Sequence, residues 1–190
     1  MVPITFYADF VCPFSYVAWC SLVPEVSEEL TLDVVWQPYQ LDPEAPAAGR
    51  EIAAHEAGRI WGSTRRLAHR FDLPINRQAP LRTPNSRPAL AAAEACRVAG
   101  TLDSFRKAAF RAWFVDGRDI SDLTVLAELA PGIDLSDPRW HVAIDTARST
   151  AQRHGISSVP AFRCSTAVLH GIRDADALLD FIEAATTNSP

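Results

Sequence analysis

The sequence places a cysteine followed by a proline where an expected strand gives way to an expected helix. Residues 2–7 form an apolar, alternating run that predicts a short strand, and residues 14–30 have the apolar spacing of a helix. Cys12 falls between them. Pro13 suits the first turn of a helix, because the N–H that proline lacks would have no partner there. The chain is therefore expected to begin its fold by passing from strand to helix at Cys12.

A thiol at this position is placed for reaction. The free backbone N–H groups and the positive end of the helix dipole favour a thiolate over a thiol. We therefore expect the pKa of Cys12 to lie below the value of about 8.5 that a free cysteine has. A small buried cysteine without reactivity is the alternative. The spacing alone leaves both open, because even a complete Cys-x-x-Cys motif needs the right fold around it.

Length and composition narrow the class of protein. The 190 residues suffice for one hydrophobic core, and 48% hydrophobic with 22% charged residues is ordinary for a globular chain. A formal net charge of −5 offers no surface for nucleic acid. No apolar run approaches the ~20 residues that cross a bilayer, and the first residues lack the pattern of a signal peptide. We expect a cytoplasmic protein that binds neither nucleic acid nor membrane.

The cysteines and histidines do not predict a metal site. The cysteines have neither metal-ligand spacing nor the density of a disulfide scaffold, so all are predicted to be free thiols, with Cys20 in the core. The histidines are scattered without pairs four residues apart and are predicted to lie at the surface or at helix ends. The cysteines are Cys12, Cys20, Cys96 and Cys164. The histidines are His55, His69, His141, His154 and His170.

Three further strands and a block of helices follow the first helix. Pro24 predicts a kink or a new segment in that helix. The alternating residues 31–36 predict a second strand, which is parallel to the first because a helix connects them. After an extended connection rich in proline, helices are expected at 50–71, 86–99, 102–116, 122–129 and 137–154. The last expected elements are strands at 160–163 and 167–170, a helix at 175–185 and a frayed tail at 186–190.

This order of elements predicts the fold class. A β-α-β unit, a helical block and a β-β-α unit make an α/β protein with a thioredoxin-like fold and an inserted all-helical domain. Residues 1–40 and 155–190 are expected to form the thioredoxin-like domain. Residues 41–154 are expected to form the helical insertion and to cover one side of Cys12.

Two groups of side chains in the insertion have two interpretations each. Trp61, Trp113 and Phe114 favour core packing, although a groove for an apolar substrate would use the same residue types. Five arginines are expected either to form a solvated helix face or to meet an anionic substrate. These arginines are Arg50, Arg59, Arg65, Arg66 and Arg70.

Five stretches of the sequence carry a resemblance to a known family. In chain order they are DFVCPFSY at 9–16, PYQLDP at 38–43, TPNS at 83–86, FRAWFVDGRDI at 110–120 and GISSVPAF at 155–162. The sequence resembles DsbA-like oxidoreductases of the FrnE type, relatives of 2-hydroxychromene-2-carboxylate isomerase and kappa-class glutathione transferase. The resemblance implies a cis peptide bond between Val159 and Pro160 that faces Cys12. Without the resemblance, Pro160 would be interpreted as an edge-strand or turn residue.

The sequence departs from this family at the motif itself. FrnE-type proteins usually have Cys-x-x-Cys, whereas this chain has Cys12-Pro13-Phe14-Ser15, and the other relatives usually have serine in place of Cys12. A second thiol resolves a mixed disulfide by attacking its sulfur, which Ser15 cannot do. We therefore expect Cys12 to be the catalytic nucleophile and Ser15 to hydrogen-bond its thiolate. An engineered replacement of cysteine would leave the same trace, but a natural variant is favoured.

The sequence is compatible with three functions. The first is a thiol–disulfide oxidoreductase that uses Cys12 alone and an external small thiol. The second is a glutathione-dependent isomerase or transferase with an apolar pocket that includes Asn85. The third is a non-catalytic scaffold. The expected partner is a small thiol or a protein disulfide, with glutathione or another small thiol as cosubstrate and no tightly bound cofactor, and a homodimer is left open.

The expected substrate-binding residues lie around Cys12 and at the start of the last helix. A glutathione carboxylate is expected at the start of the last helix, beside Arg173, because helix N-termini bind anions and the kappa-class relatives use this region. Asp174 would compete for the same N–H groups if it caps the helix. The full set is Pro13, Phe14, Asn85, Val159, Pro160 and Arg173.

Overall fold

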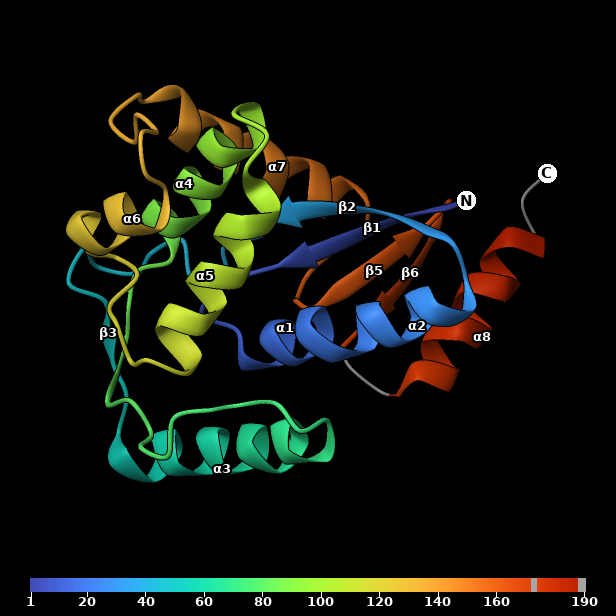
Figure 1. The fold of residues 1–190 in the computed structure, drawn as a ribbon, viewed down its shortest axis with the longest axis horizontal. Helices are drawn as coiled ribbons and strands as arrows, with labels where there is room; N and C mark the ends of the chain where they lie inside the picture. The colour runs from blue at the N-terminus through green and yellow to red at the C-terminus, as the bar shows by residue number, and fades with distance from the viewer. Residues whose placement is uncertain (172–173, 188–190) are drawn as a thin grey trace.

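A computed structural model describes residues 1–171 and 174–187 and shows a four-stranded sheet in the order β2-β1-β5-β6 (Figure 1). Its strands are β1 (Val2–Ala8), β2 (Leu32–Pro38), β5 (Ala161–Cys164) and β6 (Ala167–His170). β1 and β2 are parallel, whereas β5 is antiparallel to both of its neighbours. The predicted parallel pair and the predicted hairpin are both confirmed.

The helix that follows Cys12 is continuous but changes its winding. It consists of α1 (Pro13–Val17), a π-helical turn η1 (Ala18–Leu22) and α2 (Val23–Glu29). Pro24 lies in the first turn of α2 and has no N–H to donate to the preceding turn. A wider turn accommodates this missing hydrogen bond. The new segment predicted at Pro24 is therefore confirmed.

The helical block between β2 and β5 forms largely as predicted. Its helices are α3 (Ala54–Arg70), α4 (Arg87–Val98), α5 (Leu102–Phe114), α6 (Leu123–Leu129) and α7 (Arg139–Arg153). His154 caps α7, as a histidine at a helix end was expected to do. The expected domain boundaries, after residues 40 and 154, stay a prediction.

The helix expected at 50–71 begins too early. Its first residues form a short strand, β3 (Arg50–Glu51), which pairs antiparallel with β4 (Arg82–Thr83), and α3 follows it. Gly49 has φ +80°, and a Cβ there would lie 2.4 Å from the carbonyl oxygen of Thr83. Only glycine fits this turn and this close approach. Two-residue strands show no periodicity, so the sequence did not reveal this ribbon.

The frayed tail expected at 186–190 starts too early as well. The last helix, α8 (Ala175–Thr187), continues through Thr187, whose hydroxyl donates to the carbonyl of Glu183 at 2.8 Å. Ile182 is buried and anchors this final part of the helix. The remaining three residues lie outside the described part of the chain.

Aromatic side chains join the sheet, the cysteine helix and the helical block into one core. The ring of Phe10 lies 5.0 Å from that of Phe110 on α5. Tyr16 of α1 stacks on Phe114 at 4.9 Å, and Phe114 stacks on Trp61 of α3 at 5.6 Å. The predicted core roles of Trp61 and Phe114 are confirmed. Through these contacts the block holds the start of α1 from one side.

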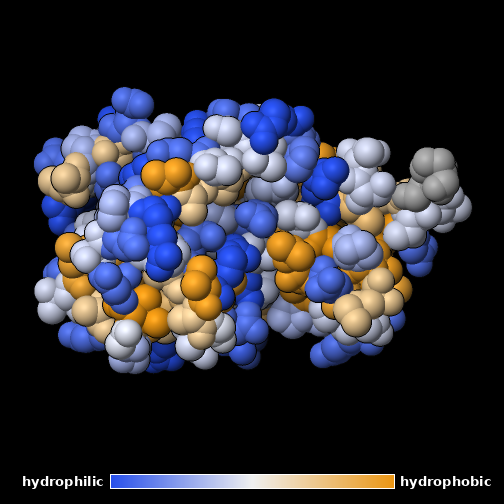
Figure 2. Space-filling model, turned by 90° about the horizontal axis from the view of Figure 1, so that it is seen from above, coloured by the Kyte–Doolittle hydropathy of each residue, from blue (hydrophilic) through white to orange (hydrophobic). Residues whose placement is uncertain are grey.

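The surface mixes polar and apolar residues. Seen from above, hydrophilic residues cover much of the face and hydrophobic residues form separate patches between them (Figure 2). Val35 and Val142 are among the exposed large apolar side chains. No helix in residues 1–171 or 174–187 is long and apolar enough to cross a membrane.

Candidate functional site

Cys12 is fixed at the junction of strand and helix by contacts in both directions. It is the N-cap residue of α1, its N–H donates to the carbonyl of Asp9 at 3.1 Å, and its carbonyl accepts from the N–H of Tyr16 at 3.1 Å. Its thiol donates to the carbonyl of Val159 at 3.4 Å, and the peptide bond between Val159 and Pro160 is cis. The cis bond that the resemblance implied is confirmed, and it faces Cys12.

A buried carboxylate holds the segments around this cysteine together. Asp9 has no exposed surface and accepts hydrogen bonds from the N–H of Val11 at 3.2 Å, the N–H of Leu41 at 2.8 Å and the hydroxyl of Ser86 at 3.0 Å. These donors belong to the loop before Cys12, the segment after β2 and the start of α4. Burial raises the pKa of Asp9 to about 6, although its hydrogen bonds lower it.

Sequence reasoning did not select Asp9 as a site residue. An acidic residue that directly follows an apolar strand was the available signal, because a carboxylate at the end of a buried strand needs donors. The donors come from positions 32 and 77 residues away as well as from the adjacent loop. Their convergence is a property of the fold.

The expected lowering of the Cys12 pKa is wrong for this structure. Burial raises the pKa of the thiol to about 11, and the nearby Asp9 carboxylate raises it further. The Ser15 side chain and backbone, together with the backbone of Phe14, lower the pKa, but they do not outweigh burial. Cys12 is only 3% exposed, so a thiolate would have little water around it. In this arrangement Cys12 is a thiol, in agreement with its hydrogen bond to Val159.

Alkylation of Cys12 should therefore respond to pH differently from that of an ordinary thiol. The thiolate is the nucleophile. With a pKa raised to about 11, Cys12 should react more slowly than a model thiol at pH 8 and its rate should keep rising toward pH 11. The rate for a model thiol should level off above its pKa of about 8.5. Stopped-flow alkylation of the folded protein measures this profile.

The unfolded protein is the control for this pH profile. In denaturant Cys12 loses its buried surroundings, so its rate should follow that of the model thiol. A folded-state rate that levels off below pH 8 would contradict the raised pKa. The raised pKa also affects stability, because the folded state favours the protonated thiol. The contribution of Cys12 to the free energy of unfolding is therefore present at neutral pH and declines as pH rises toward 11.

Ser15 occupies the position that a second cysteine has in Cys-x-x-Cys. It is fully buried on α1, close enough to Cys12 to lower the pKa of that thiol. Its hydroxyl nevertheless has no partner within hydrogen-bond distance among the described residues. A buried hydroxyl without a partner is costly in a folded protein. The expected hydrogen bond from Ser15 to a Cys12 thiolate stays a prediction.

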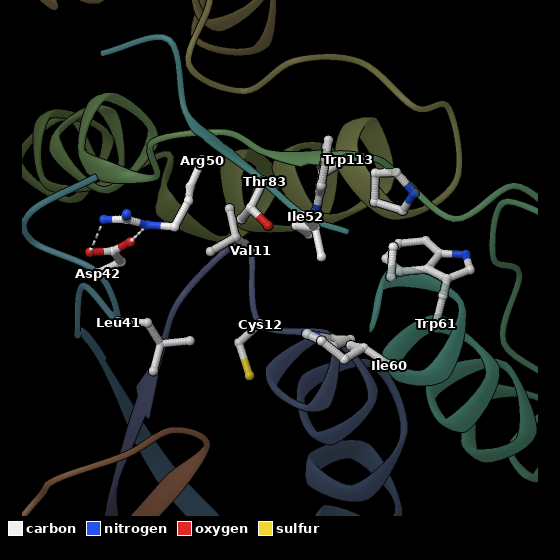
Figure 3. A pocket seen from close by; sticks show the side chains of 13 residues that line it. Val11, Cys12, Leu41, Asp42, Arg50, Ile52, Ile60, Trp61, Thr83 and Trp113 are labelled. Atoms are coloured by element: carbon white, nitrogen blue, oxygen red, sulfur yellow. Dashed lines mark hydrogen bonds and ion pairs between the residues drawn. The ribbon is translucent and has the colours of Figure 1, made fainter. Parts of the chain in front are cut away.

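A cavity of about 260 Å³ opens beside Cys12 (Figure 3). Cys12 and Pro13 form one end of it, while α3, α5 and the β3–β4 ribbon supply the other walls. The sulfur of Cys12 points away from the two tryptophans at the far side (Figure 3). Apolar residues from these walls and from the segment after β2 include Val11, Leu41, Ile52, Ile60, Trp61 and Trp113. Trp61 and Trp113 therefore fit both interpretations, core packing and a groove for an apolar substrate, because they are buried in the core and also line a cavity.

An ion pair stands at the side of this cavity. Arg50 donates to Asp42 through Nε at 2.6 Å and through a terminal nitrogen at 3.3 Å (Figure 3). This contact lowers the pKa of the Asp42 carboxyl and raises that of Arg50. Both side chains are about half exposed, so the pair contributes little to stability. Of the five arginines considered from the sequence, Arg50 is the one that lines the cavity within the described residues.

The remaining residues expected at the site have different positions. Phe14 is 39% exposed beside Pro13, at the surface near Cys12. Asn85 does not line the cavity: its Oδ1 accepts from Gln40 and from the N–H of Arg87, and its Nδ2 donates to the carbonyl of Ala45. These hydrogen bonds connect Asn85 to neighbouring segments of the chain. They do not support a role in substrate binding, which stays a prediction.

The anion site expected at the start of α8 is only partly visible. Arg173 lies outside the described residues. Asp174 is described, and its carboxylate accepts from the N–H of Ala177 at 3.0 Å. It caps the helix as considered from the sequence, and it would repel a carboxylate placed at the same N–H groups.

The other cysteines take no part in the site. Cys20, Cys96 and Cys164 are free thiols, like Cys12. Cys20 is partly buried against the main core, and Cys164 lies in β5. Within residues 1–171 and 174–187, no group of three or more His, Cys, Asp or Glu side chains could hold a metal ion.

The fold and the site together define a class of protein. A cysteine at the start of the first helix, opposite a cis-proline that precedes β5, is the arrangement of a thioredoxin-fold protein. Residues 3–183 match the DSBA-like thioredoxin domain, so the chain belongs to this family. Its sequence is also 23% identical to that of the uncharacterized protein YwbO from Bacillus subtilis, over 92% of both chains.

Solved structures share this fold over almost the whole chain. A probable DsbA oxidoreductase from Streptomyces coelicolor has a TM-score of 0.88 at 18% identity, with 100% of this chain and 92% of that chain covered. The cytosolic disulfide reductase DsbM from Pseudomonas aeruginosa with GSH has a TM-score of 0.67 at 19% identity, covering 98% and 100%. A 2-hydroxychromene-2-carboxylate isomerase also scores 0.67 at 18% identity, covering 97% and 95%.

Proposed function

We propose that the protein catalyses thiol–disulfide exchange through Cys12 alone. The observation that carries this proposal is the position of the Cys12 sulfur, at the start of α1 and 3.4 Å from the Val159 carbonyl that precedes the cis-proline. An apolar cavity opens beside Cys12. Ser15 stands where a resolving thiol would be, so the second half of the reaction needs a thiol from outside the chain.

The reaction has two exchange steps. In the first, the Cys12 thiolate attacks one sulfur of a disulfide, a new S–S bond forms to Cys12, and the old S–S bond breaks with its electron pair on the departing thiolate. In the second, the thiolate of a small thiol attacks the substrate sulfur of this mixed disulfide. A new disulfide leaves and the Cys12 thiolate is regenerated. Over both steps one half of the substrate is released as a thiolate, the other half leaves as a disulfide with the small thiol, and the protein is unchanged.

The buried thiol has to ionise before the first step. The thiol donates a hydrogen bond to the Val159 carbonyl at 3.4 Å. A substrate that takes over this carbonyl would release the thiol from it, and water at the opening would accept the proton. The raised pKa of Cys12 is compatible with this order of events, in which substrate binding precedes ionisation.

Glutathione disulfide provides the test. After incubation of the reduced protein at pH 9, where more thiolate is present, mass spectrometry should show one glutathione on the peptide that contains Cys12. Reduced glutathione should then remove it. The Cys20→Ser variant, which lacks a partly exposed thiol elsewhere, should form the same adduct. An adduct on another cysteine, or none on Cys12, would overturn the proposal.

An isomerase or transferase activity is the second candidate, and the apolar cavity beside Cys12 is the observation that favours it. In this case Cys12 or Ser15 would position the sulfur of a bound thiol rather than bond to it. Glutathione would then bind reversibly without a change in protein mass. If glutathione neither forms an adduct nor binds reversibly, the non-catalytic scaffold is the function that remains.

The proposed cosubstrate is glutathione or a related small thiol, and the proposed location is the cytoplasm. Free cysteines suit a reducing compartment, and one structural neighbour is a cytosolic disulfide reductase solved with GSH. A protein disulfide is the alternative substrate. A homodimer stays a prediction from the sequence.

A further inference from the structure

The two tryptophans that line the cavity differ in how their ring nitrogens are used. Trp61 donates from Nε1 to the carbonyl of Asn76 at 2.8 Å, and Figure 3 shows this nitrogen turned away from the cavity. Trp113 points from α5 toward Ile52 and into the cavity. It is 8% exposed, and its Nε1 is buried with no hydrogen-bond partner among the described residues.

A buried donor without a partner is an exception that requires a reason. Buried N–H groups are nearly always paired, because an unpaired one loses its hydrogen bonds to water without replacement. The neighbouring Trp61 shows that a backbone carbonyl can satisfy an indole in this part of the fold. The indole of Trp113 instead faces a cavity that a ligand can enter. A ligand with a hydrogen-bond acceptor would satisfy it.

The cavity limits the size and polarity of such a ligand. An engineered apolar cavity of about 150 Å³ is known to hold benzene. The cavity beside Cys12 measures about 260 Å³, so it can hold a ring with substituents. Its walls are mainly aliphatic and aromatic, which favours an apolar body over a peptide or a sugar.

The charges at the cavity argue against an anion. Arg50 is the one cationic residue that lines it within the described chain, and it already forms a two-bonded ion pair with Asp42. A carboxylate ligand would have to break this pair or lie beside the Asp42 carboxylate. An uncharged acceptor, such as a carbonyl oxygen, needs neither.

We propose that this cavity binds an uncharged apolar group, of the size of a substituted ring, whose acceptor oxygen takes the hydrogen bond of Trp113. The inference deepens the proposed function and rests on it: the group is the part of a small thiol or disulfide that lies beside Cys12 while its sulfur reacts. Trp113 thus favours substrates that carry a hydrogen-bond acceptor over those that do not.

Acetophenone and cumene test this inference as a matched pair, because they have nearly the same shape and only the first has a carbonyl oxygen. Binding is measured by titration of the indole N–H signals of the five tryptophans in a ¹H–¹⁵N spectrum. Acetophenone should shift the Trp113 signal downfield and cumene should not. Both ligands should also slow the alkylation of Cys12 by iodoacetamide, because Cys12 lines the same cavity.

The Trp113→Phe variant isolates the donor. It keeps an aromatic ring and removes the N–H, so the preference for acetophenone over cumene should fall by roughly threefold to tenfold. Trp140→Phe is the matched control. Trp140 donates its own Nε1 to the carbonyl of Asp134 and does not line the cavity, so the preference should stay at the wild-type value.

Three results would overturn the inference: an equal preference in wild type and Trp113→Phe, no shift of the Trp113 signal, or no protection of Cys12. The shift and the protection are measured on the wild-type protein, so they decide the matter even if the variant folds poorly. The glutathione adduct on wild-type Cys12 is a separate measurement. Its presence without acetophenone binding removes only this inference, whereas its absence removes the proposed function.

Discussion

Replacing Ser15 with cysteine should turn a lasting glutathione adduct into a transient one. Ser15 is fully buried beside Cys12, and its hydroxyl has no hydrogen bond to lose among the described residues. A thiolate there would attack the Cys12 sulfur of the mixed disulfide and release glutathione, leaving a disulfide within the chain. Because the attacking thiol is held in place, its effective concentration is high, and the adduct should fall about tenfold or more.

Mass spectrometry distinguishes the two products directly. After treatment with glutathione disulfide, Ser15→Cys should lose two hydrogens where the wild type gains one glutathione. Ser21→Cys is the control, since Ser21 lies further along the same helical path and donates its hydroxyl to the Val17 carbonyl at 2.6 Å, away from Cys12. It should keep the adduct. If Ser15→Cys retained the adduct as fully as the wild type, Ser15 could not stand in the place of a resolving thiol.

Replacing Asp9 with alanine should lower the free energy of unfolding by about 3 kcal/mol at pH 7. The substitution leaves the N–H of Val11, the N–H of Leu41 and the hydroxyl of Ser86 without their acceptor, and each such loss costs about 1–3 kcal/mol. The substitution also removes the cost of burying a carboxylate, which offsets part of the total loss from these three hydrogen bonds. Chemical denaturation followed by circular dichroism gives the difference. Asp33→Ala, an exposed carboxylate on β2, should change it by less than about 0.5 kcal/mol.

The loss caused by Asp9→Ala should grow as pH falls. The pKa of Asp9 is raised to about 6 in the folded protein, so the folded state holds this proton more tightly than the unfolded chain does. Its contribution to stability is full below pH 4 and declines as pH rises through 6. A change of about two pKa units corresponds to about 3 kcal/mol. An Asp9→Ala difference that is the same at pH 4 and pH 7 would contradict the raised pKa.

Local patterns predicted most of the fold. Alternation in residues 2–7 and 31–36, with a helix between them, is enough to predict the parallel pair, because parallel strands need a crossover connection and a helix supplies it. The resemblance supplied the cis bond at Pro160, which the residues alone would not have indicated. The short ribbon of Arg50–Glu51 and Arg82–Thr83 escaped prediction, because two-residue strands have no period and depend on Gly49 and on a distant partner.

By itself the sequence determined where Cys12 stands: after a strand, before Pro13, and with a serine in place of a second cysteine. The tertiary structure alone decided the ionisation state of this thiol. The helix start acts on Cys12 through a few adjacent residues, whereas burial comes from segments far along the chain, and the Val159 carbonyl that holds its proton is 147 residues away. The tertiary structure also decided that the indole nitrogen of Trp113 has no partner among the described residues and that a cavity lies beside it. Both depend on how segments distant in the sequence pack around Trp113.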